Sequence, residues 1–460
     1  MTATQIAPEL STRLDDIISD ETATFLGRQQ RSKEMSGRAT ALAGGATSSW
    51  QVAEPHAVWL SHGDGSKLYD VDGNEYSDFH GGYGVSLAGH NHPAIVAAVR
   101  ERVAKGTHFA QPTEDSIVVA DNLAERYHQP LWRFGNSGTE STMDACHLMR
   151  AATGRERIIK LEGGYHGHHD SVMVSVQPES VGNLGPVDAP IGIPENTGLL
   201  KATMDGTVIV PANNLPAVEA ALARYPGEIA GMILEPIMMN AGIIIPDDGY
   251  LESLKDLLHA HGALLTFDEV KTGFTCGPGG ASGLLGATSD LVCVAKAMGG
   301  GLSTSAIGGN KVMELVASGE YQQVGTFNGN PLAMAAARAM LTEVLTDDAY
   351  AHLDRLRDRM RDGLQAVIDR HDAPWRVVTA GAKGCVSFMP DRIRNFRDFR
   401  TLDGRYGHAH WLVQHNRGAF LPPWGKVEQW LTSVQHTDAD VDNFVGNFSY
   451  LADQLLGEPA

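Results

Sequence analysis

Residues 291–301 read LVCVAKAMGGG, and this stretch decides the fold. Leu291–Ala295 is a short apolar run, the pattern of a strand that is buried on both faces of a parallel sheet. Lys296 follows at once, and a lysine at the end of a buried strand is costly unless its amine is paired, neutral or covalently used. The glycines after it let the backbone pass close to a bulky ligand. The stretch therefore indicates a ligand-binding lysine, although a side chain that reaches out to solvent has a similar pattern.

Similar short runs recur along the chain between helical patterns such as Pro93–Val103. These runs are Ile158–Leu161, Val208–Val210, Gly231–Leu234 and Leu264–Phe267. Alternation of strand and helix predicts an α/β fold with a mainly parallel central sheet in a large domain. The stretch after about Leu332 begins with a long helical pattern and then mixes strands and helices, as expected of a smaller C-terminal α/β domain.

Three segments follow from these patterns. Residues 1–75 form an N-terminal segment that starts as a helical tail, and its KLYDVDGNEY stretch at 67–76 predicts a hairpin. Residues 76–332 form the large domain, and residues 333–460 form the small C-terminal domain.

The composition excludes several classes of protein. The 460 residues hold 36 Lys and Arg against 55 Asp and Glu, a net charge of −19 that repels nucleic acids and anionic membranes. The four cysteines form no CxxC pair, which argues against a disulfide framework. No basic, apolar leader opens the chain, and charged and polar residues interrupt the apolar stretch Ile229–Ile245, so we expect a cytoplasmic protein.

Two further motifs carry chemistry at predicted strand ends. Asp268 follows the run Leu264–Phe267, and a buried carboxylate there needs a cation or several hydrogen-bond donors, unless it caps the next helix. Residues 135–140 read GNSGTE and precede a helical pattern. Small residues before a helix start form an anion site for a phosphate group, although an ordinary N-cap has the same pattern.

The stretch YHGHHD at 165–170 has two interpretations. A metal site needs three or four converging ligands, and no HExxH motif or cysteine pair supports one, so we expect no metal. The ring of Tyr165 instead offers a flat stacking surface. A lysine amine, a buried carboxylate, a phosphate cradle and an aromatic platform together match what pyridoxal 5′-phosphate (PLP) requires.

Five motifs in order resemble those of the class III aminotransferases, and within that group the match is to glutamate-1-semialdehyde aminomutase and its aminotransferase relatives. The motifs are NSGTE at 136–140, GGYHGHHD at 163–170, TFDEVKTGF at 266–274, AKAMGGG at 295–301 and GTFNGNP at 325–331. The resemblance covers about residues 40–445. It implies a fold type I PLP-dependent transferase, a homodimer with active sites at the interface and small-molecule amine and keto substrates.

The resemblance assigns the two catalytic residues and the cover of the cofactor ring. Lys296 carries PLP as a Schiff base and later moves the proton, and Asp268 pairs with the pyridine nitrogen. Val270 packs on one face of the ring and Tyr165 stacks on the other.

The resemblance also assigns the residues around the cofactor's phosphate and phenolic oxygen. Ser137, Gly138 and Thr139 hold the phosphate, and Thr326 of the partner subunit reaches the same phosphate. Asn240 matches a position near the phenolic oxygen of the ring.

The substrate positions depart from the aminomutase pattern. In GGATSSWQ at 44–51, Ser48 matches, but Gln51 stands where the aminomutase has an arginine associated with the substrate carboxylate. Tyr83 replaces the family's tryptophan in GGYG at 81–84, and Glu428 is kept as the expected active-site carboxylate. Glutamine cannot replace the bidentate, fully charged contact of arginine with a carboxylate.

These departures favour an aminotransferase that works by a ping-pong cycle on an amine or a β- or ω-amino acid. The alternative is glutamate-1-semialdehyde 2,1-aminomutase, which makes 5-aminolevulinate, and a second alternative is a PLP-binding protein without catalysis. Trp50, Tyr83 and Trp424 are candidates to line an apolar pocket or to be core aromatics.

Arginines near the C-terminal domain offer another place for a carboxylate. Arg394, Arg397 and Arg400 would share one helical face, so we expect a solvated surface stripe rather than a binding site.

Overall fold

The computed structural model describes residues 8–51, 54–178, 183–423, 426 and 429–458. The chain divides into two compact units. Unit 1 comprises Met1–His92, Asp348–Arg392 and Thr401–Ala460, and unit 2 comprises Pro93–Asp347 and Ile393–Arg400. The three domain ranges expected from the sequence stay a prediction.

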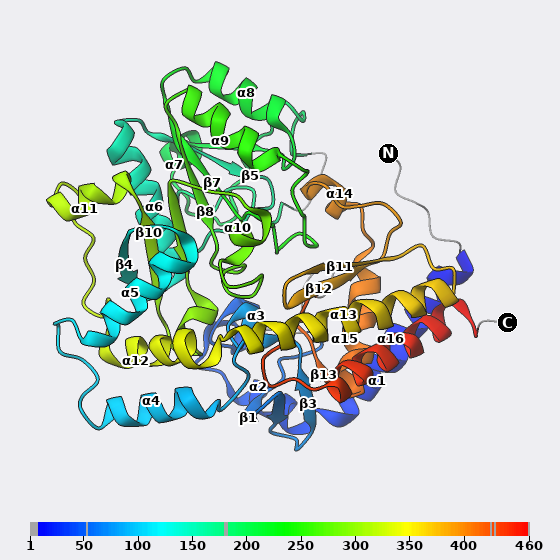
Figure 1. Ribbon diagram of the computed structural model, residues 1–460. Helices are drawn as coiled ribbons and strands as arrows, with labels where there is room; N and C mark the ends of the chain where they lie inside the picture. The colour runs from blue at the N-terminus through cyan, green and yellow to red at the C-terminus, as the bar shows by residue number, and fades with distance from the viewer. Residues whose placement is uncertain (1–7, 52–53, 179–182, 424–425, 427–428, 459–460) are drawn as a thin grey trace. The chain divides into compact units, whose positions relative to one another are not determined.

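A seven-stranded sheet forms the centre of unit 2 (Figure 1). Its strands, in spatial order, are β4 (Leu131–Gly135), β10 (Ser305–Gly309), β9 (Leu291–Val294), β8 (Leu264–Asp268), β7 (Ile229–Leu234), β5 (Arg157–Leu161) and β6 (Thr207–Val210). Strand β10 is antiparallel to both of its neighbours, and the pairs from β9 to β6 are parallel. The predicted mainly parallel sheet and all five predicted strands are confirmed, and the carboxyl ends of β4 and of β9 to β6 lie at one edge.

Helices cover this sheet because its central strands are apolar on both faces. The described helices of unit 2 are α4 (Pro93–Val103), α5 (Glu114–Tyr127), α6 (Gly138–Thr153), α7 (Lys201–Gly206), α8 (Leu215–Arg224), α9 (Tyr250–Ala260), α10 (Gly280–Leu285), α11 (Glu314–Ser318), α12 (Pro331–Ala339) and α14 (Phe396–Arg400). Cys146 and Met149 of α6 pack with Ile233 and Ile307 of the sheet in one buried cluster. This packing fixes the N-terminus of α6 at the sheet edge where the strands end.

Unit 1 holds two smaller sheets and the helices of both chain ends. One sheet has β1 (Leu60–Asp64), β2 (Lys67–Asp70), β3 (Glu75–Asp78) and β13 (Ala419–Phe420), and the other has β11 (Arg376–Ala380), β12 (Lys383–Ser387) and β14 (Gln429–Leu431). Its described helices are α1 (Pro8–Arg28), α2 (Gln30–Arg38), α3 (Gly81–Gly84), α13 (Asp347–Arg370), α15 (Gly404–Asn416) and α16 (Asp438–Leu456). Strands β2 and β3 pair antiparallel, so the hairpin predicted at 67–76 is confirmed.

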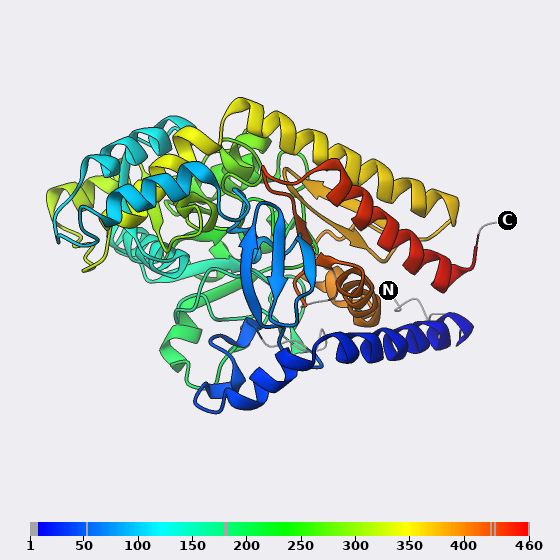
Figure 2. The same ribbon diagram turned by 90° about the horizontal axis from the view of Figure 1, so that it is seen from below.

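Helices from distant parts of the sequence form the core of unit 1. Phe25 of α1 packs with Trp411 of α15, whose rings lie 5.6 Å apart. Helices α13 and α16 run side by side in the same direction, as the yellow and red helices of Figure 2 show. Arg359 binds Asp442, and His371 binds Asp453, along this pair. The N-terminal helices are therefore part of a core that the C-terminal chain completes.

Within the described residues, no helix is both long enough and apolar enough to cross a membrane. The cytoplasmic location expected from the sequence stays a prediction.

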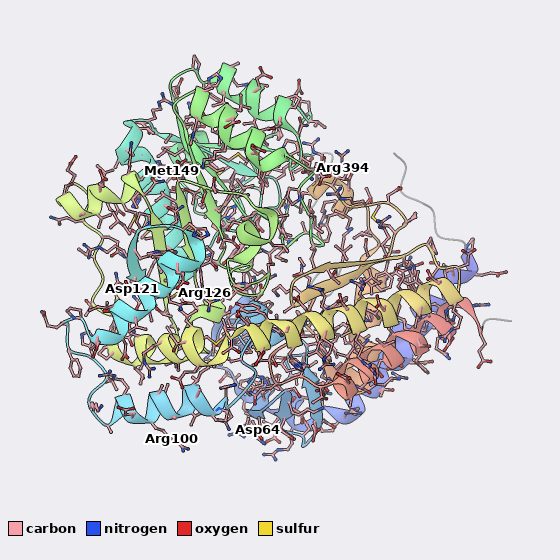
Figure 3. All side chains as sticks on the ribbon, viewed as in Figure 1. Asp64, Arg100, Asp121, Arg126, Met149 and Arg394 are labelled. Atoms are coloured by element: carbon pink, nitrogen blue, oxygen red, sulfur yellow. The ribbon has the colours of Figure 1, made fainter. Side chains whose placement is uncertain are left out.

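We predict that Gly231→Ala destabilises unit 2. A Cβ at this position of β7 would lie 2.4 Å from the sulfur of Met149 and 2.5 Å from the backbone oxygen of Leu264 (Met149 is labelled in Figure 3). Because the Leu264 oxygen belongs to the neighbouring strand, the sheet has to shift, which costs about 1–3 kcal/mol of unfolding free energy.

The shift of the urea unfolding midpoint measures this loss. Gly283→Ala in α10 is the matched control, since its Cβ meets open space, and we expect it to be neutral or stabilising by up to about 1 kcal/mol. An unchanged midpoint for Gly231→Ala would contradict the packing described here.

Candidate active site

The candidate catalytic residues lie at the carboxyl ends of adjacent strands in unit 2. Asp268 is the last residue of β8 and is in register with Cys293 of β9, the strand that leads to Lys296. Strand β7 leads to Glu235, and β5 leads to Tyr165. In open α/β sheets ligands bind outside the carboxyl ends of the strands, so this edge is the expected place for a site.

Lys296 has an unusual backbone and a perturbed amine. Its φ of +48° lies in the left-handed region, which is strained for a residue with a side chain. Burial lowers the pKa of Lys296, and the charges of Asp268 and Glu235 oppose this shift. The amine therefore loses its proton more readily than an ordinary lysine, which makes it a better nucleophile.

Asp268 is 3% exposed and bound by two donors. Its Oδ1 accepts a hydrogen bond from the backbone N–H of Val270 at 2.9 Å, and its Oδ2 lies 2.7 Å from Nδ1 of His166. His166 is buried as well, and within the described residues its Nε2 has no hydrogen-bond partner. The contact of His166 with Asp268 was not predicted, although a histidine directly after Tyr165 was the available signal.

The GNSGTE stretch forms the start of α6 and makes a capping box there. Ser137 is the N-cap: its hydroxyl accepts from the N–H of Glu140 at 3.3 Å, and the Glu140 carboxylate accepts from the N–H of Ser137 at 3.2 Å. A Cβ at Gly138 would lie 2.7 Å from a methyl group of Val270, so the backbone passes close to Val270. The first N–H groups of a helix lack partners within the helix and form its positive end.

A buried carboxylate joins the loops that carry Tyr165 and Asn240. Glu235, 3% exposed, accepts from the backbone N–H groups of Tyr165 at 3.4 Å and of Met239 at 3.0 Å. Burial raises the pKa of Glu235. The amide oxygen of Asn240 accepts from Nζ of Lys271 at 2.7 Å. Glu235 was not predicted as a site residue, although an acidic residue directly after a buried strand was the available signal.

Thr326 lies on a separate, open cleft of unit 2 with a volume of about 630 Å³. Trp132, Phe134 and Gln323 line the same cleft. The amide of Asn136 donates to the amide oxygen of Asn328 at 2.9 Å, which ties this loop to the start of α6.

The predicted substrate residues that the structure describes belong to unit 1 and are near one another. The hydroxyl of Tyr83 donates to the backbone oxygen of Trp50 at 2.6 Å, and the two rings are 5.4 Å apart. The backbone N–H of Gln51 donates to the oxygen of Ser48 at 3.0 Å, and its side-chain oxygen accepts from Thr47. Glu428 and Trp424 lie outside the described residues.

The predicted solvated arginine stripe is wrong for Arg397. Helix α14 has five residues, and the Arg397 side chain is 16% exposed and binds the fully buried carboxylate of Glu162 through two hydrogen bonds. A buried carboxylate needs a cation or several hydrogen-bond donors, and Arg397 supplies both to Glu162, which outweighs the tendency of arginine to face solvent. Among the described residues, no group of three or more His, Cys, Asp or Glu forms a place for a metal ion.

Comparison with known proteins gives a consistent result. The family model "Aminotransferase class-III" matches residues 49–449. Glutamate-1-semialdehyde 2,1-aminomutase 2 of Halalkalibacterium halodurans is 38% identical over 84% of this chain and 88% of its own length.

Two solved structures have the same fold. A glutamate-1-semialdehyde-aminomutase from Pseudomonas aeruginosa PAO1, in complex with PMP, superimposes with a TM-score of 0.88 at 27% identity over 97% of this chain and 99% of that one. An omega-transaminase from Sphaerobacter thermophilus superimposes with a TM-score of 0.87 at 30% identity, over 92% of this chain and 97% of that one.

Proposed function

Because the chain belongs to the class III aminotransferases, a family of PLP-dependent enzymes, we propose that it transfers an amino group from an amine or amino acid to a carbonyl acceptor. The observation that carries the proposal is that Lys296, with its lowered pKa, and the buried Asp268 lie at the ends of neighbouring strands. The amine donor we favour is an amine or a β- or ω-amino acid.

The residues present fit PLP by charge and by space. The N–H groups at the start of α6 suit a phosphate dianion, and the missing side chain of Gly138 leaves backbone donors accessible. Asp268 suits a protonated pyridine nitrogen. Its carboxylate is buried away from water, and a cationic ring would supply the charge partner that water no longer provides. The amine of Lys296 suits the aldehyde.

Each residue then has a defined task. PLP, when bound, supplies a ring that accepts electrons from the substrate. Lys296 would hold the aldehyde carbon of the cofactor, and its free Nζ would act as the general base and general acid that moves the proton of the substrate Cα. Asp268 would hold the pyridine nitrogen, and His166 fixes the direction of the Asp268 carboxylate.

The surrounding residues would hold the ring. Val270, whose N–H is bound by Asp268, would pack on the ring together with Tyr165. Ser137, Gly138 and Thr139 would hold the phosphate at the positive end of α6. Asn240, oriented by Lys271, would bind the phenolic oxygen.

We predict that Lys296→Ala lowers kcat about 10²–10⁴-fold, because it removes both the attachment point and the proton-transfer group. Borohydride reduction followed by peptide mass spectrometry should place a pyridoxyl tag on the Lys296 peptide of the unaltered protein. Lys255→Ala in α9, at a half-buried residue whose amine donates to the hydroxyl of Thr288 at 2.7 Å, is the control and should keep full activity. A tag on another lysine, with normal turnover in Lys296→Ala, would contradict the assignment.

The second candidate function is that of glutamate-1-semialdehyde 2,1-aminomutase, the name of the relative that is 38% identical. Against it stands Gln51, which has no charge for a substrate carboxylate and whose amide oxygen is bonded to Thr47.

A single assay separates the two candidates. We predict that the protein incubated with glutamate-1-semialdehyde alone forms little 5-aminolevulinate, whereas an amine donor and a keto acceptor together give steady turnover.

Gln51→Arg should raise kcat/KM for donors whose carboxylate would contact residue 51, by about tenfold for one charged hydrogen bond. Efficient 5-aminolevulinate formation by the unaltered protein would favour the aminomutase, and PLP binding without any turnover would favour a non-catalytic binder.

We also propose a homodimer in which the loop around Thr326 meets a second copy. Val324 is 82% exposed and Phe327 is 58% exposed beside Thr326, and large apolar side chains gathered in this way mark contact surfaces. Thr326 of the partner subunit would then reach the phosphate held by α6.

We predict that Val324→Asp combined with Phe327→Asp yields monomers with weakened PLP binding, because charges then face the apolar contact. Leu200→Asp is the control, since Leu200 is 65% exposed and precedes α7 and β6, at the sheet edge opposite to β4. Light scattering after size exclusion measures the mass. A dimer that persists in the double variant would refute this contact surface.

A further inference from the structure

The segment Ile393–Arg400 leaves the chain of unit 1 and folds with unit 2. Its Arg397 makes a paired contact with Glu162: Nε donates to Oε2 at 2.9 Å, and Nη2 donates to Oε1 at 2.8 Å. Arg397 also donates to the backbone oxygens of Gly185 at 2.9 Å and Leu184 at 3.3 Å. Its donors are therefore directed at fixed acceptors inside unit 2.

Glu162 starts the turn that carries two residues of the candidate site. The turn of residues 162–167 holds Tyr165, the expected ring cover, and His166, which binds Asp268 at 2.7 Å. Lys160, the buried lysine of the strand before Glu162, donates instead to the backbone oxygen of Val174 at 2.7 Å. The hydrogen-bonded cation of Glu162 in the described structure is thus Arg397.

The segment Ile393–Arg400 packs against this turn and also against the loop that carries Asn240. A Cβ at Gly163, whose φ is +77°, would lie 2.2 Å from the ring of Phe396. A Cβ at Gly242, just after Asn240 in sequence, would lie 2.9 Å from Ile393. One short segment therefore contacts both loops that present Tyr165 and Asn240.

We propose that Arg397 is a positioning residue, which holds the turn of residues 162–167 through Glu162 so that Tyr165 and His166 keep their places around the cofactor. The inference rests on the proposed function. Without Arg397, the carboxylate of Glu162 would be buried and unpaired, and it would turn toward water and pull the turn with it. A displacement of about 1 Å near reacting atoms lowers rates by roughly 100-fold.

The test compares Arg397→Met with Arg397→Lys and with Arg394→Met. Lysine keeps the charge but not the two parallel hydrogen bonds. Arg394 is the matched control: it lies in the same segment (Figure 3), is 56% exposed and binds Asp247 on the surface. Three readouts apply: the dissociation constant of PLP, the pH midpoint of the bound cofactor's absorbance band, and amide hydrogen exchange of residues 163–166 without cofactor.

We expect Arg397→Met to weaken PLP binding about 10–100-fold, to move the pH midpoint and to speed exchange at residues 163–166. Arg397→Lys should recover part of each change, and Arg394→Met should match the unaltered protein. Lower thermal stability with unchanged affinity, pH midpoint and exchange would overturn the proposal, because Arg397 would then only stabilise the fold.

A double variant keeps the test valid if Arg397→Met fails to fold. Glu162→Gln with Arg397→Met leaves no buried charge unpaired, so it should regain stability but still bind PLP weakly and exchange fast. Binding as tight as in the unaltered protein would overturn the proposal. If the unaltered protein binds no PLP, the proposed function fails. Separately, slow amide exchange at residues 163–166 in both Arg397→Met and the double variant would refute the role of Arg397.

Discussion

The carboxylate of Asp268 is the constraint around which this structure is built. It ends a buried strand, and the N–H of Val270 and the ring of His166 satisfy its two oxygens. An ionised carboxylate in such a place is stable only with directed donors, and a cationic ring nitrogen is a further partner that suits it. The position of Lys296 beyond the adjacent strand follows from the same parallel packing.

Three buried carboxylates organise the loops at this edge of the sheet, each with a different kind of partner. Asp268 has an imidazole, Glu235 has backbone N–H groups, and Glu162 has the guanidinium of Arg397. Because buried polar and charged groups without partners are costly, these contacts hold the loops in place. Hydrogen bonds to buried carboxylates thus fix the loops of the site, and the sheet positions the strand ends that carry them.

The sequence was informative where one local pattern determines the structure. Apolar runs buried on both faces gave the strands, and the residues directly after them, Asp268 and Lys296, lie where parallel strands end. Strand β10 was missed because its small residues lack the β-branched pattern of the other strands. Arg397 was misjudged because its partner Glu162 is distant in sequence, and helical spacing says nothing about such a contact. The family and its cofactor were predictable, whereas the amine donor was not, and Glu428, one of the residues proposed to bind it, lies outside the described residues.

We propose that Lys296 and Asp268 form one cofactor site, and a crystal structure of the protein grown with PLP would decide whether they do. We expect continuous electron density from Nζ of Lys296 to the aldehyde carbon of PLP. We also expect a carboxylate oxygen of Asp268 about 2.7–3.0 Å from the pyridine nitrogen. Cofactor bound elsewhere, or a pyridine nitrogen that faces a group other than Asp268, would refute this site.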